Sequence, residues 1–399
     1  MVLLEQVFTK NFFQNVFVDY FKKDAEILNI VVEDLLKPGE NYCSEMKRIL
    51  ITYNTEGQNG RTISIVAKCT PENEYNAKFV NEMKLFDCEL EIYGTVLPKF
   101  HTLDHFEQIA PQVYSCCTKP VPIILLEDLS KIDFKLVARR DGLDLEHSLL
   151  VMEKLAHLHA ASVTLYEKDC DTFKRFDRII FQETEIKDKI MRTCYDEVVE
   201  ICRRVPELHK YVSKLTTPTV KDRIFNKMYR VHQNNSKFKV LNHGDCWTNN
   251  IMFRYDEAGI LVDLRFVDFQ GSCFASPCLD LHYYLSCSLQ SDINDQKGVI
   301  IDHYFDHLLK NLGKFHAKAF PNREEFDNDF KSTCYMGFAG ALLTLTVCKV
   351  TKTDNASAQS FINDDGVNSF RYHCFHNEEY IKEVMDYLPF YDKLGIFDV

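Results

Sequence analysis

Short, mainly hydrophobic runs bounded by polar or turn-forming residues predict strands in the first third of the chain. Two such runs, Met46–Tyr53 and Arg61–Cys69, are separated by a segment that contains Asn59-Gly60, a dipeptide favoured in tight hairpin turns. A third run, Val121–Leu126, ends in polar residues. The sequence therefore predicts an antiparallel hairpin and a further strand in this region.

Apolar residues at steps of three and four predict helices elsewhere. This spacing is present over residues 1–36 and again over Glu72–Tyr93, a helix that Pro98 would end. It is strong over Leu145–Glu167, and from Asp295 onward the chain is mostly helical in pattern. We therefore expect a mixed α/β front third and a helix-rich remainder.

Composition and charge narrow the class of protein. The chain has 399 residues, of which 46% are hydrophobic and 27% charged, which is typical of globular proteins with large cores. Its formal net charge of −12 argues against a general binder of nucleic acid or anionic membrane. The 15 cysteines include no C-x-x-C pair, which indicates reduced thiols. With no signal peptide and no membrane-spanning run, we expect a cytoplasmic protein.

The most informative motif is His243-Gly244-Asp245-Cys246-Trp247-Thr248-Asn249-Asn250. Phosphoryl transfer needs a carboxylate that orients the attacking hydroxyl, and an amide and a second carboxylate that hold magnesium. Asp245 and Asn250 have the D-x-x-x-x-N spacing of a kinase catalytic loop, and Asp268 follows at the end of a predicted hairpin. A hairpin here would bring both carboxylates to one place.

A lysine and a glutamate complete this pattern in the front third. Lys68 ends a predicted strand in Ile65-Val66-Ala67-Lys68, close to the V-A-I-K pattern of a phosphate-pairing lysine. Such a lysine needs a carboxylate from the next helix. Glu89 shares a helix face with the apolar residues and is our first candidate; Glu82 is the second, and Glu91 is nearly opposite on the helix.

Several segments together resemble one known family. The chain is similar to the ecdysteroid kinase-like, or CHK kinase-like, family of insects, within the aminoglycoside phosphotransferase and choline kinase superfamily. The matching segments are Gly39–Ser44, Phe86–Pro98, Leu126–Leu129, Leu155–Ser162, His243–Asn250, Asp268–Gln270, Pro277–Leu281 and Leu388–Asp398. The resemblance therefore covers essentially the whole chain.

This resemblance implies an α+β, protein-kinase-like fold of two lobes. Residues 1–129 would form an antiparallel-sheet N-terminal lobe, and residues 130–399 a mainly helical C-terminal lobe. It also implies an ATP- and Mg²⁺-dependent phosphotransferase whose acceptor is a hydroxyl of a small-molecule alcohol, either an ecdysteroid or a foreign compound in detoxification. Nothing indicates a nucleic-acid or membrane partner, and the oligomeric state is left open.

The resemblance also assigns roles to the catalytic residues. Asp245 would be the base, Asn250 and Asp268 the magnesium ligands, and Lys68, held by Glu89, the phosphate contact. Asp280, in the segment that follows, is expected to brace the rear lobe by hydrogen bonds.

The nucleotide contacts lie in the front lobe. The turn at Gly39 lacks the G-x-G-x-x-G of protein kinases, so we expect Asn41 and Ser44 to supply contacts to phosphate. Adenine would lie along the hinge, where backbone groups such as those of Glu127 and Leu129 offer hydrogen bonds.

Two other classes of function stay open. A choline-, ethanolamine- or aminoglycoside-type kinase would share the same catalytic residues, because only the acceptor pocket differs. A catalytically degenerate binding protein is the other, although intact Lys68, Asp245, Asn250 and Asp268 disfavour it. The pairs His303/His307 and His101/His105 have a spacing at which histidines share zinc, but the sequence offers no third ligand.

Overall fold

The computed structural model describes residues 7–22, 24–35, 44–71, 74–119, 121–351, 358–363 and 366–398. The chain forms two compact units. Unit 1 consists of Met1–Lys99 and Ala110–Lys135, and unit 2 of Phe100–Ile109 and Leu136–Val399. Strand β6 (Phe134–Leu136) lies at the boundary between these units, near the boundary placed at residues 129 and 130 from the sequence.

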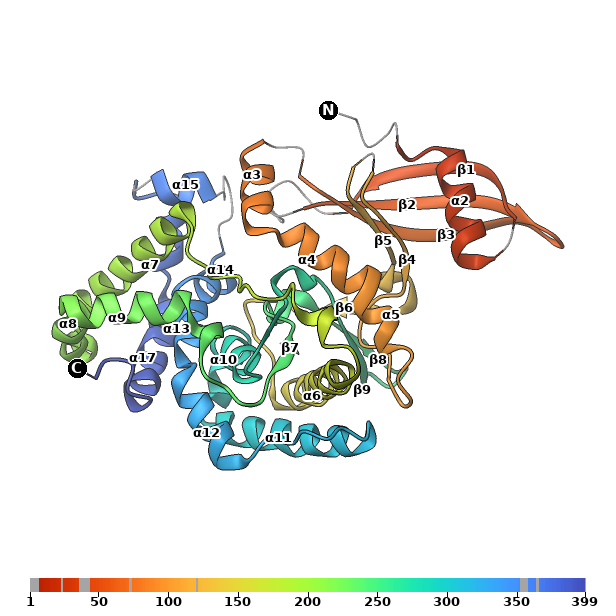
Figure 1. Ribbon diagram of the computed structural model, residues 1–399. Helices are drawn as coiled ribbons and strands as arrows, with labels where there is room; N and C mark the ends of the chain where they lie inside the picture. The colour runs from red at the N-terminus through yellow and green to blue at the C-terminus, as the bar shows by residue number, and fades with distance from the viewer. Residues whose placement is uncertain are drawn as a thin grey trace. The chain divides into compact units, whose positions relative to one another are not determined.

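Unit 1 is built on a five-stranded antiparallel sheet in the order β1-β2-β3-β5-β4 (Figure 1). Its strands are β1 (Glu26–Asp34), β2 (Glu45–Thr55), β3 (Gln58–Cys69), β4 (Val113–Cys117) and β5 (Ile123–Glu127). The predicted hairpin is confirmed as β2–β3, but its turn is Glu56-Gly57. Asn59 and Gly60 instead lie within β3, where the Gly60 N–H donates to the Asn54 side chain over 2.8 Å.

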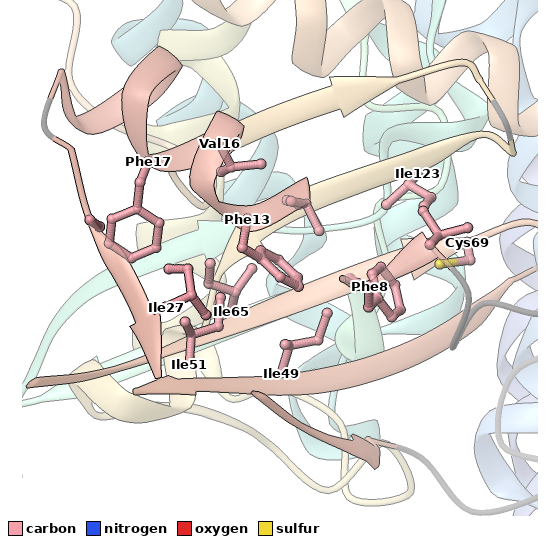
Figure 2. Packing of buried hydrophobic residues seen from close by; sticks show 14 residues of the cluster. Phe8, Phe13, Val16, Phe17, Ile27, Ile49, Ile51, Ile65, Cys69 and Ile123 are labelled. Carbon is pink, nitrogen blue, oxygen red and sulfur yellow. The ribbon is translucent and has the colours of Figure 1, made fainter. Parts of the chain in front are cut away.

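Helix α2 (Lys10–Phe21) covers one face of this sheet (Figure 2). Phe13 and Phe17 are buried on the helix, and they belong to one hydrophobic cluster with Ile49 of β2 and Ile65 of β3. Burial of each such side chain stabilises the fold by about 1.5–3 kcal/mol. This cluster holds helix α2 against the sheet, whose strand β3 carries Lys68.

The expectation of one helical segment over residues 1–36 is wrong beyond α2. Helix α2 ends at Phe21, and the residue after it, Lys22, has a left-handed φ of 53°. Glu26–Asp34 then forms edge strand β1. Among the described residues this strand pairs only with β2, and it is largely exposed, so its Ile and Val residues reflect β-propensity instead of a buried helix face.

The predicted helix over Glu72–Tyr93 is interrupted. Its described part consists of α3 (Glu74–Met83), α4 (Leu85–Glu91), a π-helical turn η1 (Ile92–Val96) and α5 (Leu97–Phe100). The break lies at Lys84, whose φ is 52°. Pro98 does not end the helix, because α5 continues directly from η1 and runs on to Phe100.

Unit 2 is mainly helical. Its α-helices are α6 (Leu145–Lys168), α7 (Glu185–Arg204), α8 (His209–Thr216), α9 (Pro218–Tyr229), α10 (Cys278–Cys287), α11 (Lys297–Lys314), α12 (Arg323–Ser332), α13 (Cys334–Leu342), α14 (Thr344–Lys349), α15 (Ala358–Asn363), α16 (Phe370–Phe375) and α17 (Glu378–Lys393). The long helix predicted over Leu145–Glu167 is confirmed as α6. The unit also contains short antiparallel strands.

Two antiparallel strand pairs flank the segment His243–Asn250, which lies between β7 (Val240–Asn242) and β8 (Ile251–Tyr255). The first joins β7 to β10 (Cys273–Ala275), and the second, β8 to β9 (Leu261–Phe266), confirms the predicted hairpin. In the described part of the chain no helix is both long and apolar enough to span a bilayer. The 14 cysteines described are all free thiols.

Candidate active site

The segment His243–Asn250 follows β7 directly and is held by buried Asp280. The backbone N–H groups of His243 and Gly244 donate to the two carboxylate oxygens of Asp280 over 2.6 and 2.8 Å. His159 of α6 approaches the same carboxylate at 3.1 Å. The expectation that Asp280 braces this part of the chain is confirmed, because its carboxylate fixes the backbone that precedes Asp245.

Gly244 is required by the backbone itself. Its φ is +79°, and a Cβ atom at this position would lie 1.8 Å from the carbonyl oxygen of Gly271. Any side chain would therefore push apart the two loops that carry Asp245 and Asp268.

Asn250 is oriented by Asp245. The amide nitrogen of Asn250 donates to the backbone oxygen of Asp245 over 2.9 Å and to its Oδ2 over 3.1 Å. Because both contacts are acceptors, they fix the amide orientation and direct the Asn250 oxygen away from Asp245. That oxygen is the kind of ligand that Mg²⁺ prefers.

Asp268 follows β9 in a strained conformation. Its φ and ψ are both 67°, in the left-handed region that non-glycine residues rarely adopt. The Val267 N–H, one residue earlier, donates to the Asn250 carbonyl oxygen over 2.9 Å. The β8–β9 hairpin thus returns Asp268 to the start of β8. Its carboxylate and the Asn250 amide oxygen are both of the donor type that Mg²⁺ prefers.

The electrostatics of Asp245 are unusual for an aspartate. Burial, and next the negative charge of Asp268, raise its pKa to about 7, although hydrogen bonds from Tyr283, Gln270 and Asn250 oppose the rise. A carboxyl with this pKa exchanges a proton near neutral pH, as a general base requires. A cation near Asp268 would lower the pKa by offsetting that charge.

Tyr283 is a neighbour of Asp245 that the sequence analysis missed. Its hydroxyl, from α10, donates to Asp245 Oδ1 over 2.8 Å, and Thr344 Oγ1 lies 2.8 Å from the same hydroxyl. Since the tyrosine proton is directed to the carboxylate, Thr344 is the donor of the second bond. The available signal was the position of Tyr283 one helical turn after Asp280.

Lys68 and Glu89 form a buried ion pair within unit 1. Lys68 Nζ lies 2.6 Å from Glu89 Oε2, and the side chains are 4% and 1% exposed. Lys68 lies in β3 opposite Met46 and Ile124, so its strand is paired on both sides. Glu82, the second candidate, is instead 3.8 Å from Lys78 on the helix surface.

The residues predicted to contact the nucleotide lie before β2 and along the hinge at the end of β5. Ser44 is buried just before β2, whereas Asn41 lies outside the described residues. The Glu127 N–H donates to the Gln112 oxygen over 2.8 Å, so this N–H already has an acceptor within the protein. Leu129 begins the helical turn η2 (Leu129–Ile132), so its N–H has no acceptor within that turn.

Asp128, between these two hinge residues, is a structural centre, although the sequence analysis placed it in the hinge without a role of its own. Its carboxylate accepts hydrogen bonds from Arg48 over 2.7 Å, Ser64 over 2.6 Å and Ser130 over 2.6 Å. Burial raises its pKa, but these donors together lower it below the usual aspartate value. The ionised carboxylate therefore ties the hinge to β2 and β3.

Comparisons with known proteins now decide the family. The family model described as "Ecdysteroid kinase-like family" matches residues 38–334, more than half of the chain. The chain belongs to the ecdysteroid kinase-like family. Over these residues the resemblance inferred from sequence is thereby confirmed, together with the α+β, protein-kinase-like fold class, whereas the segment Leu388–Asp398 lies outside the match. As a member of this family the protein is a small-molecule phosphotransferase.

Solved structures similar to this ecdysteroid kinase-like protein are distant in sequence. A choline kinase from Cryptosporidium parvum Iowa II is 14% identical with a TM-score of 0.47, over 92% of each chain. A Plasmodium vivax ethanolamine kinase is 15% identical with a TM-score of 0.42, over 91% of this chain and 83% of that one. A spectinomycin phosphotransferase is 12% identical with a TM-score of 0.43, over 97% and 99%. None of the curated proteins compared matches the chain.

Proposed function

We propose that this protein transfers the γ-phosphoryl group of Mg-ATP to a hydroxyl of an ecdysteroid-like or xenobiotic alcohol. The arrangement of Asp245 and Asn250, whose amide is turned by hydrogen bonds toward Asp245, carries the proposal. It supplies a base with a pKa of about 7 beside an oxygen ligand for magnesium. Family membership supports the same class of reaction.

In the proposed step, Asp245 orients the acceptor hydroxyl. The hydroxyl oxygen forms a bond to Pγ as the bond from Pγ to the β,γ-bridging oxygen breaks, and ADP leaves. The hydroxyl proton passes to the Asp245 carboxylate, which has lone pairs left after its bonds from Tyr283 and Asn250. Holding the reactants in line supplies most of the rate enhancement in such reactions.

Asn250 and Asp268 are proposed as the magnesium ligands. When bound, magnesium would neutralise charge on the phosphates. The protein's part is to keep the Asn250 oxygen turned away from Asp245 and to hold Asp268 in its strained position after β9.

Lys68, fixed by Glu89, is proposed to pair with the nucleotide phosphates, and Asn41 and Ser44 to contact phosphate as well. The Glu127 carbonyl and the Leu129 N–H are proposed to bind adenine. Asp128 supports this assignment, because its bonds to Arg48 and Ser64 hold the hinge still.

A phosphate-transfer screen tests the function. Purified protein and Mg-ATP are incubated with ecdysteroids, plant phenols and other foreign alcohols, choline, ethanolamine and aminoglycosides, and products are identified by mass. We expect phosphate esters of steroid or foreign alcohols, absent with Asp245→Ala. Transfer to choline, ethanolamine or an aminoglycoside alone would overturn the substrate class, and Mg-ATP binding with no transfer to any alcohol would favour a degenerate binding protein.

A further inference from the structure

Three side chains that the phosphotransfer site does not use converge between helices α6 and α11. His303 and His307 lie one turn apart on α11, and Glu153 lies on α6, which packs against α11 (Figure 1). Nε2 of His303 and Nε2 of His307 lie 3.1 and 3.7 Å from the same Glu153 oxygen, Oε1. One donor atom from each residue lies within 4.8 Å of the other two.

These distances fit a metal ion better than a simple hydrogen-bonded cluster. Zinc binds imidazole nitrogen and carboxylate oxygen at about 2.0–2.2 Å in tetrahedral geometry, which places neighbouring ligand atoms roughly 3.3–3.5 Å apart. The observed 3.1 and 3.7 Å bracket that separation. A hydrogen bond accounts for the His303 contact, but it leaves the second histidine at 3.7 Å without one.

The pKa of His307 also suits a metal ligand. Burial lowers the pKa of His307, and the neighbouring His303 lowers it further, although Glu153 opposes this. Neutral imidazole is the form that binds metal. The two ring centroids lie 4.4 Å apart at 32°, so the imidazoles are neighbours on the same face of α11.

The sequence analysis gave this pair no third ligand. Glu153 is separated from His303 by the whole catalytic segment, and only the packing of α6 on α11 brings them together. His101 and His105 have the same spacing, but they lie in turns between α5 and β4, and His105 has a φ of 68°. They therefore share no helix face.

We propose that Glu153, His303 and His307 bind a zinc-class divalent ion that clips α6 to α11. Two nitrogens and one carboxylate select a borderline ion such as Zn²⁺ over Mg²⁺, which prefers oxygen ligands in an octahedron. The three side chains are 24–40% exposed, so the ion has an entry path and a fourth position open to water. The proposal is independent of the proposed substrate.

The test is a zinc titration of the full chain, freed of metal by a chelator and then held in excess Mg²⁺. We expect the wild-type protein to bind one Zn²⁺ per chain. The Kd for Zn²⁺ should rise at least about 100-fold in His303→Ala/His307→Ala and about 10-fold in Glu153→Gln. The double variant His101→Ala/His105→Ala is the matched control and should bind like wild type. Equal affinity in wild type and His303→Ala/His307→Ala would overturn the proposal.

Cobalt substitution separates this site from the thiols. Co²⁺ held by two histidines and a carboxylate should give visible bands of a tetrahedral ion without a thiolate charge-transfer band, and Glu153→Gln should reduce them. A thiolate band, or a spectrum unchanged in the histidine variant, would place the ion on cysteine and contradict the assignment. Circular dichroism of each variant shows that the fold is retained.

Discussion

The Tyr283 hydroxyl donates a hydrogen bond to Oδ1 of Asp245 over 2.8 Å, and both residues are buried. The bond stabilises the ionised carboxylate against the burial and the Asp268 charge that raise its pKa. We therefore expect Tyr283 to position the proposed base and to adjust the pH at which it works.

Replacing Tyr283 by Phe should shift the acidic limb of the kcat/KM profile to higher pH. Loss of the donor raises the pKa of Asp245 above its value of about 7, so a smaller fraction is ionised at neutral pH. A shift of one unit would reduce kcat/KM about tenfold on the acidic side and leave the alkaline plateau near wild type. The measurement is kcat/KM for the acceptor across pH.

Thr344→Val is the control for that experiment. Thr344 donates to the Tyr283 hydroxyl, so its loss should move the profile less than Tyr283→Phe. A uniform fall of kcat/KM at every pH in Tyr283→Phe would indicate a packing defect instead of a change in the pKa.

Asp245→Asn should raise the stability of the nucleotide-free protein above about pH 7. The folded-state pKa of Asp245 is raised from 3.8 to about 7, so the folded state holds a proton that the unfolded state has lost between these values. Wild-type stability therefore falls as pH rises through this window, and the cost is complete above the folded pKa. The amide variant avoids this cost. Thermal unfolding at about pH 4 and pH 8, with chelator present, should show a larger gain at the higher pH.

Lys68→Met should lower kcat/KM for ATP by about 100-fold or more, because the proposed phosphate contact is lost. The change also leaves Glu89 buried without its ion-pair partner, which costs stability of about 3–5 kcal/mol. Lys68→Met/Glu89→Leu removes both charges and should regain stability without activity. Lys47→Met is the matched control, because Lys47 pairs with a largely exposed Asp34. Recovery of ATP turnover in Lys68→Met/Glu89→Leu would contradict the role of Lys68.

Asp268→Asn should raise the Mg²⁺ concentration that gives half-maximal rate by about tenfold or more, since the carboxylate is the charged member of the proposed ligand set. Asn250→Ala should raise the required Mg²⁺ concentration in the same way. It should also remove the hydrogen bond that the Asn250 amide donates to Asp245 Oδ2 over 3.1 Å. Rates measured against Mg²⁺ at fixed ATP give the comparison. An unchanged Mg²⁺ dependence in both variants would remove these residues from the metal site.

Local patterns in the sequence were enough to predict much of this arrangement. Glu89 was found because steps of three and four place it on the buried face of its helix, and the ion pair with Lys68 lies on that face. The kinase spacing of Asp245 and Asn250 was likewise visible, and the structure joins the two by hydrogen bonds.

Contacts between distant parts of the chain were not predictable in this way. Tyr283 reaches Asp245 from α10, and Glu153 meets His303 only through packing of α6 on α11. Edge strand β1 was missed because β-branched residues on an exposed strand lack the alternation of a buried one. The register of the β2–β3 hairpin likewise overrode the turn preference of Asn59-Gly60.

Single-turnover transfer of a radiolabelled γ-phosphoryl group to an accepted alcohol is the most direct test of the chemistry. Wild type and Asp245→Ala are compared at saturating Mg-ATP, and nucleotide affinity is measured separately. Loss of transfer by a factor of about 1,000 or more, with nucleotide affinity within a few-fold of wild type, is the predicted result. Transfer by Asp245→Ala at a rate close to wild type would contradict the assignment of Asp245 as the base.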